Sequence, residues 1–119
     1  MEQRSYKSFA EFWPYYVSEH RMPGTRRLHF FGTLVGLLLL LTVLVVGPLW
    51  LLLLALVCGY FFAWVGHFFI EKNRPATFKY PLYSFAGDLK MFTLMLRGKM
   101  DNEIKRHAGE TGFQSGKFT

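Results

Sequence analysis

The sequence predicts an all-α membrane protein, built on a two-span transmembrane helical hairpin with flanking amphipathic interfacial helices. Three observations predict this class. No Asp, Glu, Lys or Arg occurs between Leu28 and Ile70, and a run of that length accommodates two membrane-spanning helices of about 20 residues each. A Gly47-Pro48 pair divides the run near its middle. Aromatic and basic residues gather on both sides of the run, as they do at membrane interfaces.

The segment before the apolar run predicts a short interfacial helix over residues 8–20. Ser8-Phe9-Ala10-Glu11 fits a capping box, in which a hydroxyl and a carboxylate satisfy the free amides of the first helical turn. The segment is rich in aromatic residues, which suit the headgroup level of a bilayer. Pro14 is expected to bend or end this helix after about one and a half turns, because proline lacks an amide donor.

The apolar run itself predicts spans at residues 28–46 and 49–70. Helices are expected because backbone groups in lipid must be satisfied within the segment. Pro48 disfavours helix at the residue before it, so Gly47-Pro48 is interpreted as the turn. A soluble protein with an apolar helical hairpin in its core is the alternative, but it would not need so long a run. The single cysteine, Cys58, is interpreted as a packing residue of the second span.

Small residues at Gly32 and Gly36 form a close-packing motif in the first span. A homo-oligomer and packing inside the hairpin explain this motif equally well, and both stay open.

The segment after the run predicts a second interfacial helix over residues 84–100. Its apolar residues, among them Phe85 and Leu89, share one face, while the charged residues lie mostly elsewhere. It is too charged to cross a bilayer and is expected to lie along it. Residues 1–100 thus form a single membrane domain, followed by a polar, Gly-rich and loosely ordered tail over residues 101–119.

The charge distribution predicts the orientation. The formal net charge is +6, and the basic residues lie beyond both ends of the run but not in its turn. Both termini are therefore expected in the cytoplasm, with the protein in a bacterial inner membrane or the endoplasmic reticulum. The basic excess also suits contact with anionic membrane lipids. Nucleic acid is not expected as a partner, because no nucleic-acid motif accompanies the charge. No signal peptide is predicted, since the run starts late and lacks a cleavage site.

Three histidines are expected to meet at the cytoplasmic margin of the hydrocarbon. His29 and His67 are equidistant from Pro48, so a hairpin brings them to the same depth. His20 is close enough in sequence to fold back over them, and Glu71 follows His67 by one helical turn. Imidazoles at a membrane boundary are costly unless they bind, pair or react. With the carboxylate they form a ligand set for a first-row transition metal, whose identity the spacing does not specify. Interfacial side chains bonded to backbone or lipid phosphate are the alternative.

A set of motifs surrounds these histidines: FWPYY at residues 12–16, Glu19-His20, Pro23 and His29, then GHFFIEK at residues 66–72 and Pro75-Ala76. Together they resemble the small membrane proteins related to the yeast 2-hydroxy-fatty-acid dioxygenase of phytosphingosine breakdown. The resemblance covers about residues 6–100. It implies an iron(II)-dependent α-oxidation enzyme, which uses molecular oxygen to remove the carboxyl carbon of a 2-hydroxy fatty acid. It also implies that His20, His29 and His67 hold the iron.

A substrate orientation follows from this resemblance. The fatty-acid tail would lie among the leucines of the hairpin, and its carboxylate would lie at the headgroup level. Basic residues near that level could neutralise the carboxylate; they are Arg21, Arg26, Arg27, Lys72 and Arg74.

Glu71 is the candidate catalytic residue. It could serve as a fourth ligand, a partner that orients His67 or a general base, and its helical spacing from His67 favours the orienting role. Asn73 and Tyr80 could be polar contacts near the mouth of the site, but the interpretation as helix-ending and interfacial residues is favoured, and no role is expected for His107.

Two other functional classes stay open on the sequence. The protein could be a non-catalytic membrane module whose basic, aromatic-rich ends bind anionic lipid or a partner. Alternatively, two of the histidines could be axial ligands of a haem in an electron-transfer protein. A visible absorption spectrum distinguishes these classes, since a Soret band indicates haem and a colourless protein with stoichiometric iron indicates the dioxygenase.

Overall fold

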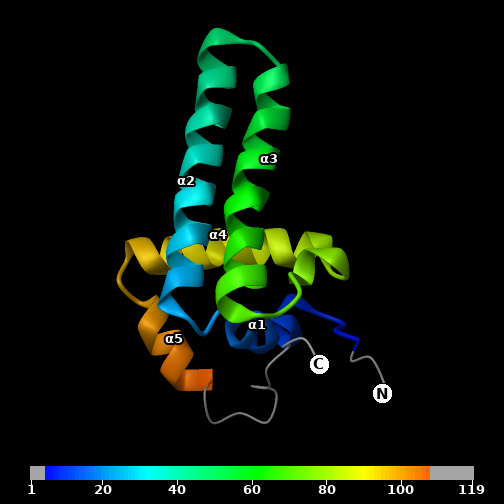
Figure 1. The fold of residues 1–119 in the computed structure, drawn as a ribbon, viewed down its shortest axis with the longest axis vertical. Coiled ribbons are helices and arrows are strands. Elements are labelled where there is room, and N and C mark those ends of the chain that lie inside the picture. The colour runs from blue at the N-terminus through cyan, green and yellow to red at the C-terminus, as the bar shows by residue number, and fades with distance from the viewer. Residues whose placement is uncertain (1–4, 108–119) are drawn as a thin grey trace.

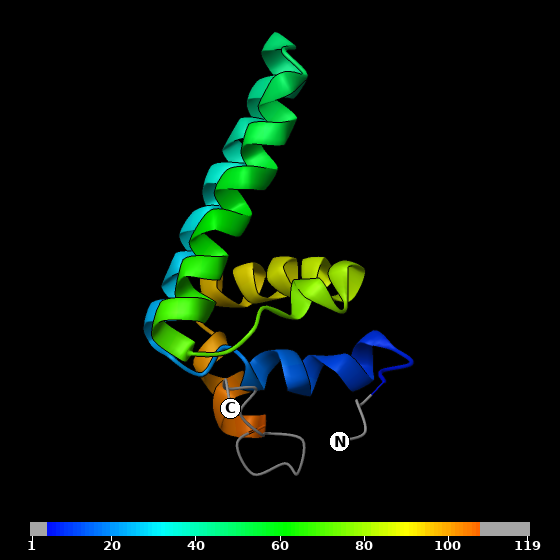
Figure 2. The same ribbon diagram turned by 45° about the vertical axis from the view of Figure 1, so that its right-hand side comes forward.

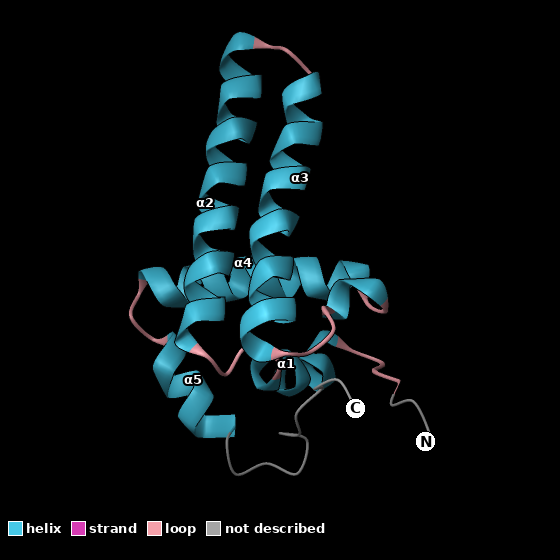
Figure 3. Cartoon of the chain, in the orientation of Figure 1, coloured by secondary structure: helices cyan, strands magenta, loops and turns pink. Residues whose placement is uncertain are grey.

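The computed structural model describes residues 5–107. The elements are α1 (Phe9–Ser18), α2 (Pro23–Val46), α3 (Trp50–Val65), the π-helix η1 (Gly66–Glu71), the short 3₁₀-helix η2 (Ala76–Phe78), α4 (Pro81–Leu96) and α5 (Met100–His107). Figure 3 shows helices joined by short loops over this part of the chain, with no strand among the described residues. The predicted all-α class is therefore confirmed.

The two apolar helices, α2 and α3, lie side by side and antiparallel in both views (Figures 1 and 2). They are joined at Gly47, whose φ of 98° is left-handed and favours glycine. The helix over the first apolar segment begins at Pro23 rather than Leu28, because proline fits the first turn of a helix. The close contact between the helices explains Gly32, since a Cβ atom there would lie 2.9 Å from the carbonyl oxygen of Gly59.

Both apolar helices have the length and composition of membrane spans. Pro23–Val46 and Trp50–Glu71 are long and apolar enough to cross a membrane. The side chains nearest the turn have almost no cover from the rest of the protein: Leu44 is 76% exposed and Leu49 is 72% exposed. Contiguous apolar surface of this extent is rare on soluble monomers and indicates contact with lipid or another apolar partner.

The end of the second apolar helix departs from α-helical geometry. Its α-helix ends at Val65, and the π-helix η1 continues it to Glu71. Gly66 allows close contact with α2, since a Cβ atom there would lie 2.9 Å from Cγ2 of Thr25. Lys72 then ends the helix with a left-handed φ of 62°, and the amide of Asn73 donates to the carbonyl oxygen of His67 at 3.0 Å. The chain therefore turns back toward His67 immediately after η1.

The hairpin stands on a platform formed by α4, α1 and α5. Helix α4 crosses the base of the hairpin, and α1 and α5 lie on its far side (Figures 1 and 2). Phe12, Trp13 and Tyr16 of α1 are buried in a core that also contains Met91 and Met100. The expectation that the aromatic residues of this first helix face lipid headgroups is therefore wrong for these three, because the platform covers rings whose burial is strongly favourable.

The start of α1 confirms half of the predicted capping box. The Ser8 side chain accepts a hydrogen bond from the Glu11 amide at 3.2 Å, whereas the Glu11 carboxylate accepts from the amide of Lys7 at 3.0 Å and not from that of Ser8. Pro14 does not end the helix, which continues to Ser18. The buried aromatic face of α1 offsets the one backbone hydrogen bond that proline removes.

The C-terminal part differs from the predicted layout. Helix α4 ends at Leu96, and α5 covers Met100–His107, so the expectation of a loosely ordered tail from Asp101 onward is wrong for residues 101–107. Tertiary contacts hold this helix: Met100 is buried, and the Glu103 carboxylate lies 3.5 Å from Nε1 of Trp13. Residues 108–119 of the predicted tail lie outside the described part of the chain.

Candidate metal centre

The fold brings three buried histidines together. His20 follows α1, His29 lies in α2 and His67 lies in η1. One ligand atom from each lies within 4.8 Å of the others. The Nε2 atom of His29 is 3.1 Å from Nε2 of His20 and 3.1 Å from Nε2 of His67. The structure therefore places all three predicted metal ligands around one point.

His20 presents a free nitrogen lone pair to this point. Its Nδ1 atom lies 2.6 Å from the carbonyl oxygen of Tyr16, and because a carbonyl only accepts hydrogen bonds, Nδ1 carries the proton. The ring also stacks on that of Tyr16, with centroids 4.0 Å apart. Burial, followed by the nearby imidazoles of His29 and His67, lowers the pKa of His20 well below its ordinary value. The ring is therefore neutral, and its Nε2 atom is unprotonated.

Asn73 fixes the tautomer of His67 in the same way. Nδ1 of His67 lies 2.7 Å from the side-chain oxygen of Asn73. The Asn73 amide group donates to the carbonyl oxygen of Glu19 at 3.1 Å, which determines which end of the side chain is the oxygen. Nδ1 of His67 therefore donates, and Nε2 faces the other histidines with its lone pair.

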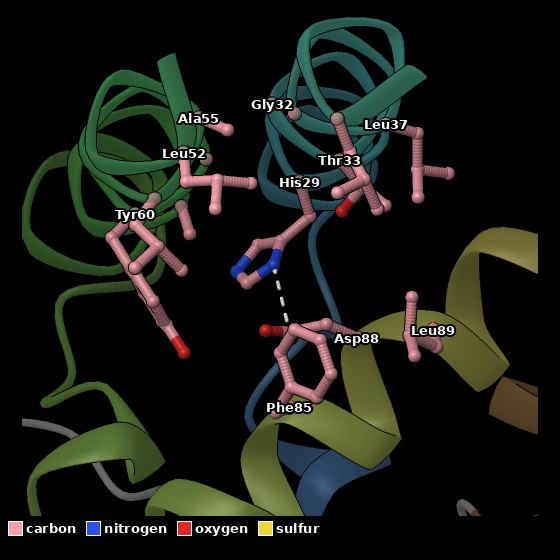
Figure 4. Close-up of a pocket in the computed structure, with 15 residues that line it drawn as sticks. His29, Gly32, Thr33, Leu37, Leu52, Ala55, Tyr60, Phe85, Asp88 and Leu89 are labelled. Carbon is pink, nitrogen blue, oxygen red and sulfur yellow. Dashed lines mark ion pairs between the residues drawn. The ribbon is translucent and has the colours of Figure 1, made fainter. Parts of the chain in front are cut away.

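His29 has an acidic partner on the platform. Its Nδ1 atom lies 3.4 Å from the Asp88 carboxylate of α4 (Figure 4). The Tyr16 hydroxyl donates a hydrogen bond to the same carboxylate oxygen, Oδ1. Burial, followed by the charge of Asp88, raises the pKa of Tyr16 well above its ordinary value, so the hydroxyl keeps the proton that it donates. A carboxylate beside Nδ1 favours the tautomer in which Nε2 of His29 is unprotonated.

Together these partners leave three lone pairs directed at one another. Nitrogen atoms 3.1 Å apart are at hydrogen-bond distance, yet in the tautomers that these partners favour, with the protons on Nδ1, none of them has a proton to donate. A cation between them would turn this repulsion into coordination. Ligand nitrogens about 2.1 Å from one ion lie about 3 Å apart in adjacent octahedral positions, which fits the observed spacing. Three imidazoles suit a first-row transition metal such as iron, copper, nickel or zinc.

The same distances do not favour a haem between His29 and either of the other two imidazoles. Axial nitrogens on opposite faces of a haem iron lie about 4 Å apart, at about 2 Å from the metal on each side. The Nε2 atom of His29 lies 3.1 Å from that of His20 and 3.1 Å from that of His67, and the three rings contact one another edge to face. The arrangement therefore fits an ion better than a macrocycle.

Glu71 lies apart from the three ligand atoms. Its carboxylate accepts a hydrogen bond from the backbone amide of Met22, so it holds the connection between His20 and α2. Asn73 takes the position beside His67 that the sequence favoured for Glu71. The sequence signal for Asn73 was its place directly after the last helical turn, where a reversal of the chain returns its side chain to His67.

The five basic residues proposed from the sequence occupy two kinds of position. Arg26 is buried, and its guanidinium donates to the carbonyl oxygens of His20 at 2.8 Å and Arg21 at 2.7 Å. It also pairs with Asp101 of α5 at 3.3 Å. Arg21 is half-buried, and the remaining three are exposed: Arg27, Lys72 and Arg74. Arg26 therefore supports the loop that carries His20, whereas the others lie at the surface.

A cavity of about 340 Å³ adjoins the centre between α2, α3 and α4. Most of its lining is apolar, and its polar side chains are His29, Thr33, Tyr60 and Asp88 (Figure 4). None of the five basic residues, all in the described part of the chain, lines it. Sequence reasoning missed Asp88 by grouping it with the charged residues off the apolar face of the helix over 84–100. The sequence feature that could have identified Asp88 is that it is the only acidic residue in α4.

Comparison with known proteins adds one match. A family model described as 2-hydroxy-palmitic acid dioxygenase Mpo1-like matches residues 6–100. No curated protein and no solved structure matches the chain. The matched residues include the three histidines and their partners Asn73 and Asp88, so the complete centre lies inside the matched region.

Proposed function

The chain belongs to the Mpo1-like family, and on that premise we propose that it is an iron(II)-dependent dioxygenase of 2-hydroxy fatty acids, embedded in a membrane. The proposed reaction uses molecular oxygen to remove the carboxyl carbon of the substrate by α-oxidation. One observation carries the proposal: the Nε2 atoms of three buried histidines converge while a hydrogen-bond acceptor faces each Nδ1 atom. A non-catalytic lipid-binding module would have no need for this arrangement.

The membrane placement rests on the two apolar helices. We propose that α2 and α3 cross the bilayer and that the platform lies at the headgroup level on the cytoplasmic side, with both termini. The exposed apolar side chains near the hairpin turn and the basic residues near its base support this orientation. The three histidines then lie at the boundary between hydrocarbon and headgroups, where a fatty acid presents its carboxyl end.

The ligands of the proposed iron are His20, His29 and His67. Bound there, iron(II) supplies the redox chemistry that activates molecular oxygen and lets it react with the 2-hydroxy acid. The protein's own contribution is orientation. The Tyr16 carbonyl and the Asn73 side-chain oxygen each accept a hydrogen bond from one Nδ1 atom, and the Asp88 carboxylate lies 3.4 Å from the third. Such partners orient the lone pairs and increase the basicity of the ligands.

The surface around the centre suits an anionic lipid. We propose that Arg21, Arg27, Lys72 and Arg74 attract the substrate carboxylate to the membrane face. Arg26 contributes by holding the carbonyl oxygens of the loop that carries His20. Glu71 contributes in a similar way, since its carboxylate holds the Met22 amide at the start of α2. Both residues thus support the position of His20.

Elemental analysis of anaerobically purified protein, followed by oxygen uptake, tests the proposal. We expect stoichiometric iron, no Soret band, and oxygen consumption with 2-hydroxypalmitic acid that yields a product one carbon shorter. Protein that holds no first-row metal and consumes no oxygen with this substrate would instead be the non-catalytic membrane module.

A further inference from the structure

The cavity between α2, α3 and α4 is polar at one end and apolar at the other. His29, Tyr60 and Asp88 line it near the platform (Figure 4). Leu37, Leu40 and Leu52 also line it, and they lie nearer the hairpin turn along α2 and α3. From residue 29 to residue 40, α2 rises about 16 Å at about 1.5 Å per residue. A cavity with this polarity and length fits a single-chain amphiphile whose polar end lies against the platform.

We propose that this cavity holds the acyl chain of the 2-hydroxy fatty acid, and that Asp88 accepts a hydrogen bond from the substrate's 2-hydroxyl group. Asp88 would thereby select hydroxylated over plain fatty acids. The inference rests on the proposed function for the identity of the substrate. Beyond that function, it assigns a residue that recognises the substrate and a location for the substrate's acyl chain.

The position of Asp88 supports this role. Among the described residues that line the cavity, it is the only one with a carboxylate, guanidinium or ammonium group. Its side chain is 15% exposed, and the contacts from the Tyr16 hydroxyl and from His29 are both made to Oδ1. Because a carboxylate offers about four lone-pair sites on two oxygens, acceptor capacity remains for a ligand in the cavity.

The charge of Asp88 orients the ligand. A fatty-acid carboxylate has no proton to donate at neutral pH, and it is repelled by a second carboxylate in a poorly solvated cavity. A hydroxyl group can donate to Asp88. With the hydroxyl at Asp88, the adjacent carboxylate would point away from it, toward the candidate metal centre beside His29. Asp88 therefore separates the two polar groups of a 2-hydroxy acid.

The cavity is reached from the apolar side of the protein. Phe85 and Leu89 line it from α4 and are themselves 49% and 36% exposed. They lie where the platform meets the exposed hairpin, so a lipid substrate can reach the cavity from the bilayer without crossing water.

Binding measured by calorimetry under anaerobic conditions, where turnover cannot occur, tests the role of Asp88. The full-length, iron-loaded protein is titrated with 2-hydroxypalmitic acid and with palmitic acid. We expect the wild type to prefer the hydroxylated acid. Asp88→Asn should reduce that preference by about 10-fold or more, since a hydrogen bond to a charged group contributes about 1.5–3 kcal/mol. Asp88→Asn also removes the carboxylate beside Nδ1 of His29, so both proteins are titrated only after full iron loading has been verified.

Two results would overturn the role of Asp88. One is an equal loss of affinity for both acids. The other is an Asp88→Asn variant that loses iron but, in the fraction that keeps it, still prefers the hydroxylated acid as the wild type does. Either result would mean that Asp88 only positions His29. Because binding is measured without oxygen, a protein that discriminates the two acids but shows no oxygen uptake would refute the proposed function and leave this inference standing.

A second pair of variants tests independently where the acyl chain of the substrate lies. Ala55 lines the cavity (Figure 4), so Ala55→Phe should fill it and shift the preference toward shorter 2-hydroxy acids. Each methylene group that no longer fits should lower the affinity about fourfold. Leu53→Phe is the matched control, because Leu53 lies on the same helix and is 67% exposed. An Ala55→Phe variant with the wild-type chain-length profile would exclude the cavity as the acyl-chain site.

Discussion

The Nδ1 atom of His67 lies 2.7 Å from Oδ1 of Asn73, and the Nδ2 group of Asn73 donates to the carbonyl oxygen of Glu19 at 3.1 Å. One amide side chain therefore connects η1 to the residue that precedes His20. Removal of such an outer partner of a metal-binding histidine commonly lowers metal affinity about 10–100-fold. We predict a loss of this size for Asn73→Ala, measured by competition for iron(II) with a chelator of known affinity.

Asn102→Ala is the matched control for this variant. Asn102 is exposed on α5, so its removal should leave iron affinity unchanged. Wild-type affinity in Asn73→Ala would show that the ring of His67 is held in place by packing alone.

Replacement of one ligand should release the metal without unfolding the protein. We predict that His67→Gln abolishes retention of iron, because glutamine offers no imidazole nitrogen at the centre, while the helical circular dichroism stays unchanged. His107→Gln serves as the control, since His107 bonds to Glu103 on α5 and should retain iron. Full iron content in His67→Gln would contradict the assignment of His67 as a ligand.

Metal removal should lower thermal stability. A ligand that binds only the folded state stabilises it by about 2.7 kcal/mol at 100 times its dissociation constant. We therefore predict that a chelator lowers the unfolding temperature of the solubilised wild-type protein, and that added iron(II) restores it. The same treatment should leave the unfolding temperature of His67→Gln unchanged, and a chelator effect of equal size in that variant would place the metal elsewhere.

Arg26 and Arg27 are adjacent in sequence but should respond differently to replacement by methionine. Arg26 is 6% exposed and donates to the carbonyl oxygen of His20, and a hydrogen bond from a charged group contributes about 1.5–3 kcal/mol. We predict that Arg26→Met lowers both the unfolding free energy and iron retention. Arg27→Met should leave both unchanged, because Arg27 is exposed. If Arg26→Met raised only the KM for the fatty acid, Arg26 would be a substrate contact instead.

The contact between α2 and α3 predicts different effects on stability when two of its glycines are replaced by alanine. A Cβ atom at Gly32 would lie 2.9 Å from the Gly59 carbonyl oxygen, whereas one at Gly36 would lie 3.5 Å from that of Ala55, an ordinary contact. We predict that Gly32→Ala destabilises the protein by about 1–3 kcal/mol through overpacking and that Gly36→Ala changes stability little. Thermal unfolding in detergent measures both. Equal, small effects would mean that the helices can separate at Gly32 without cost.

Periodicity and distance along the chain predicted the parts of the fold that depend on neighbouring residues. The apolar run gave two helices and a turn at Gly47, and equal distances from Pro48 placed His29 and His67 together. His20 followed because few residues separate it from His29. These predictions needed only the rise of a helix and the position of one turn.

The remaining features depend on contacts between distant segments. Asp88 meets His29 only because α4 crosses the base of the hairpin, and periodicity within one helix does not specify such a crossing. The aromatic residues of α1 have the composition of an interfacial helix, and their burial follows from cover by α4 and α5. Asn73 reaches His67 because the backbone of Lys72 adopts a left-handed conformation. This conformation favours glycine, so a lysine at this position does not predict it.

The π-helical segment Gly66–Glu71 has a consequence for how insertions and deletions would act on this protein. A π-helical turn contains about one residue more than an α-helical turn. Deleting a single residue there would let the segment return to regular α-helical winding and barely change its hydrophobic length. Because the wider turn is lost together with its extra residue, everything that follows would keep about the same facing, whereas a deletion in the regular α-helix α3 would rotate it by about 100°. The loss of one residue in α3 would thus leave a chain that is apolar enough to enter a bilayer, but with His67 and Asn73 turned away from His20 and His29.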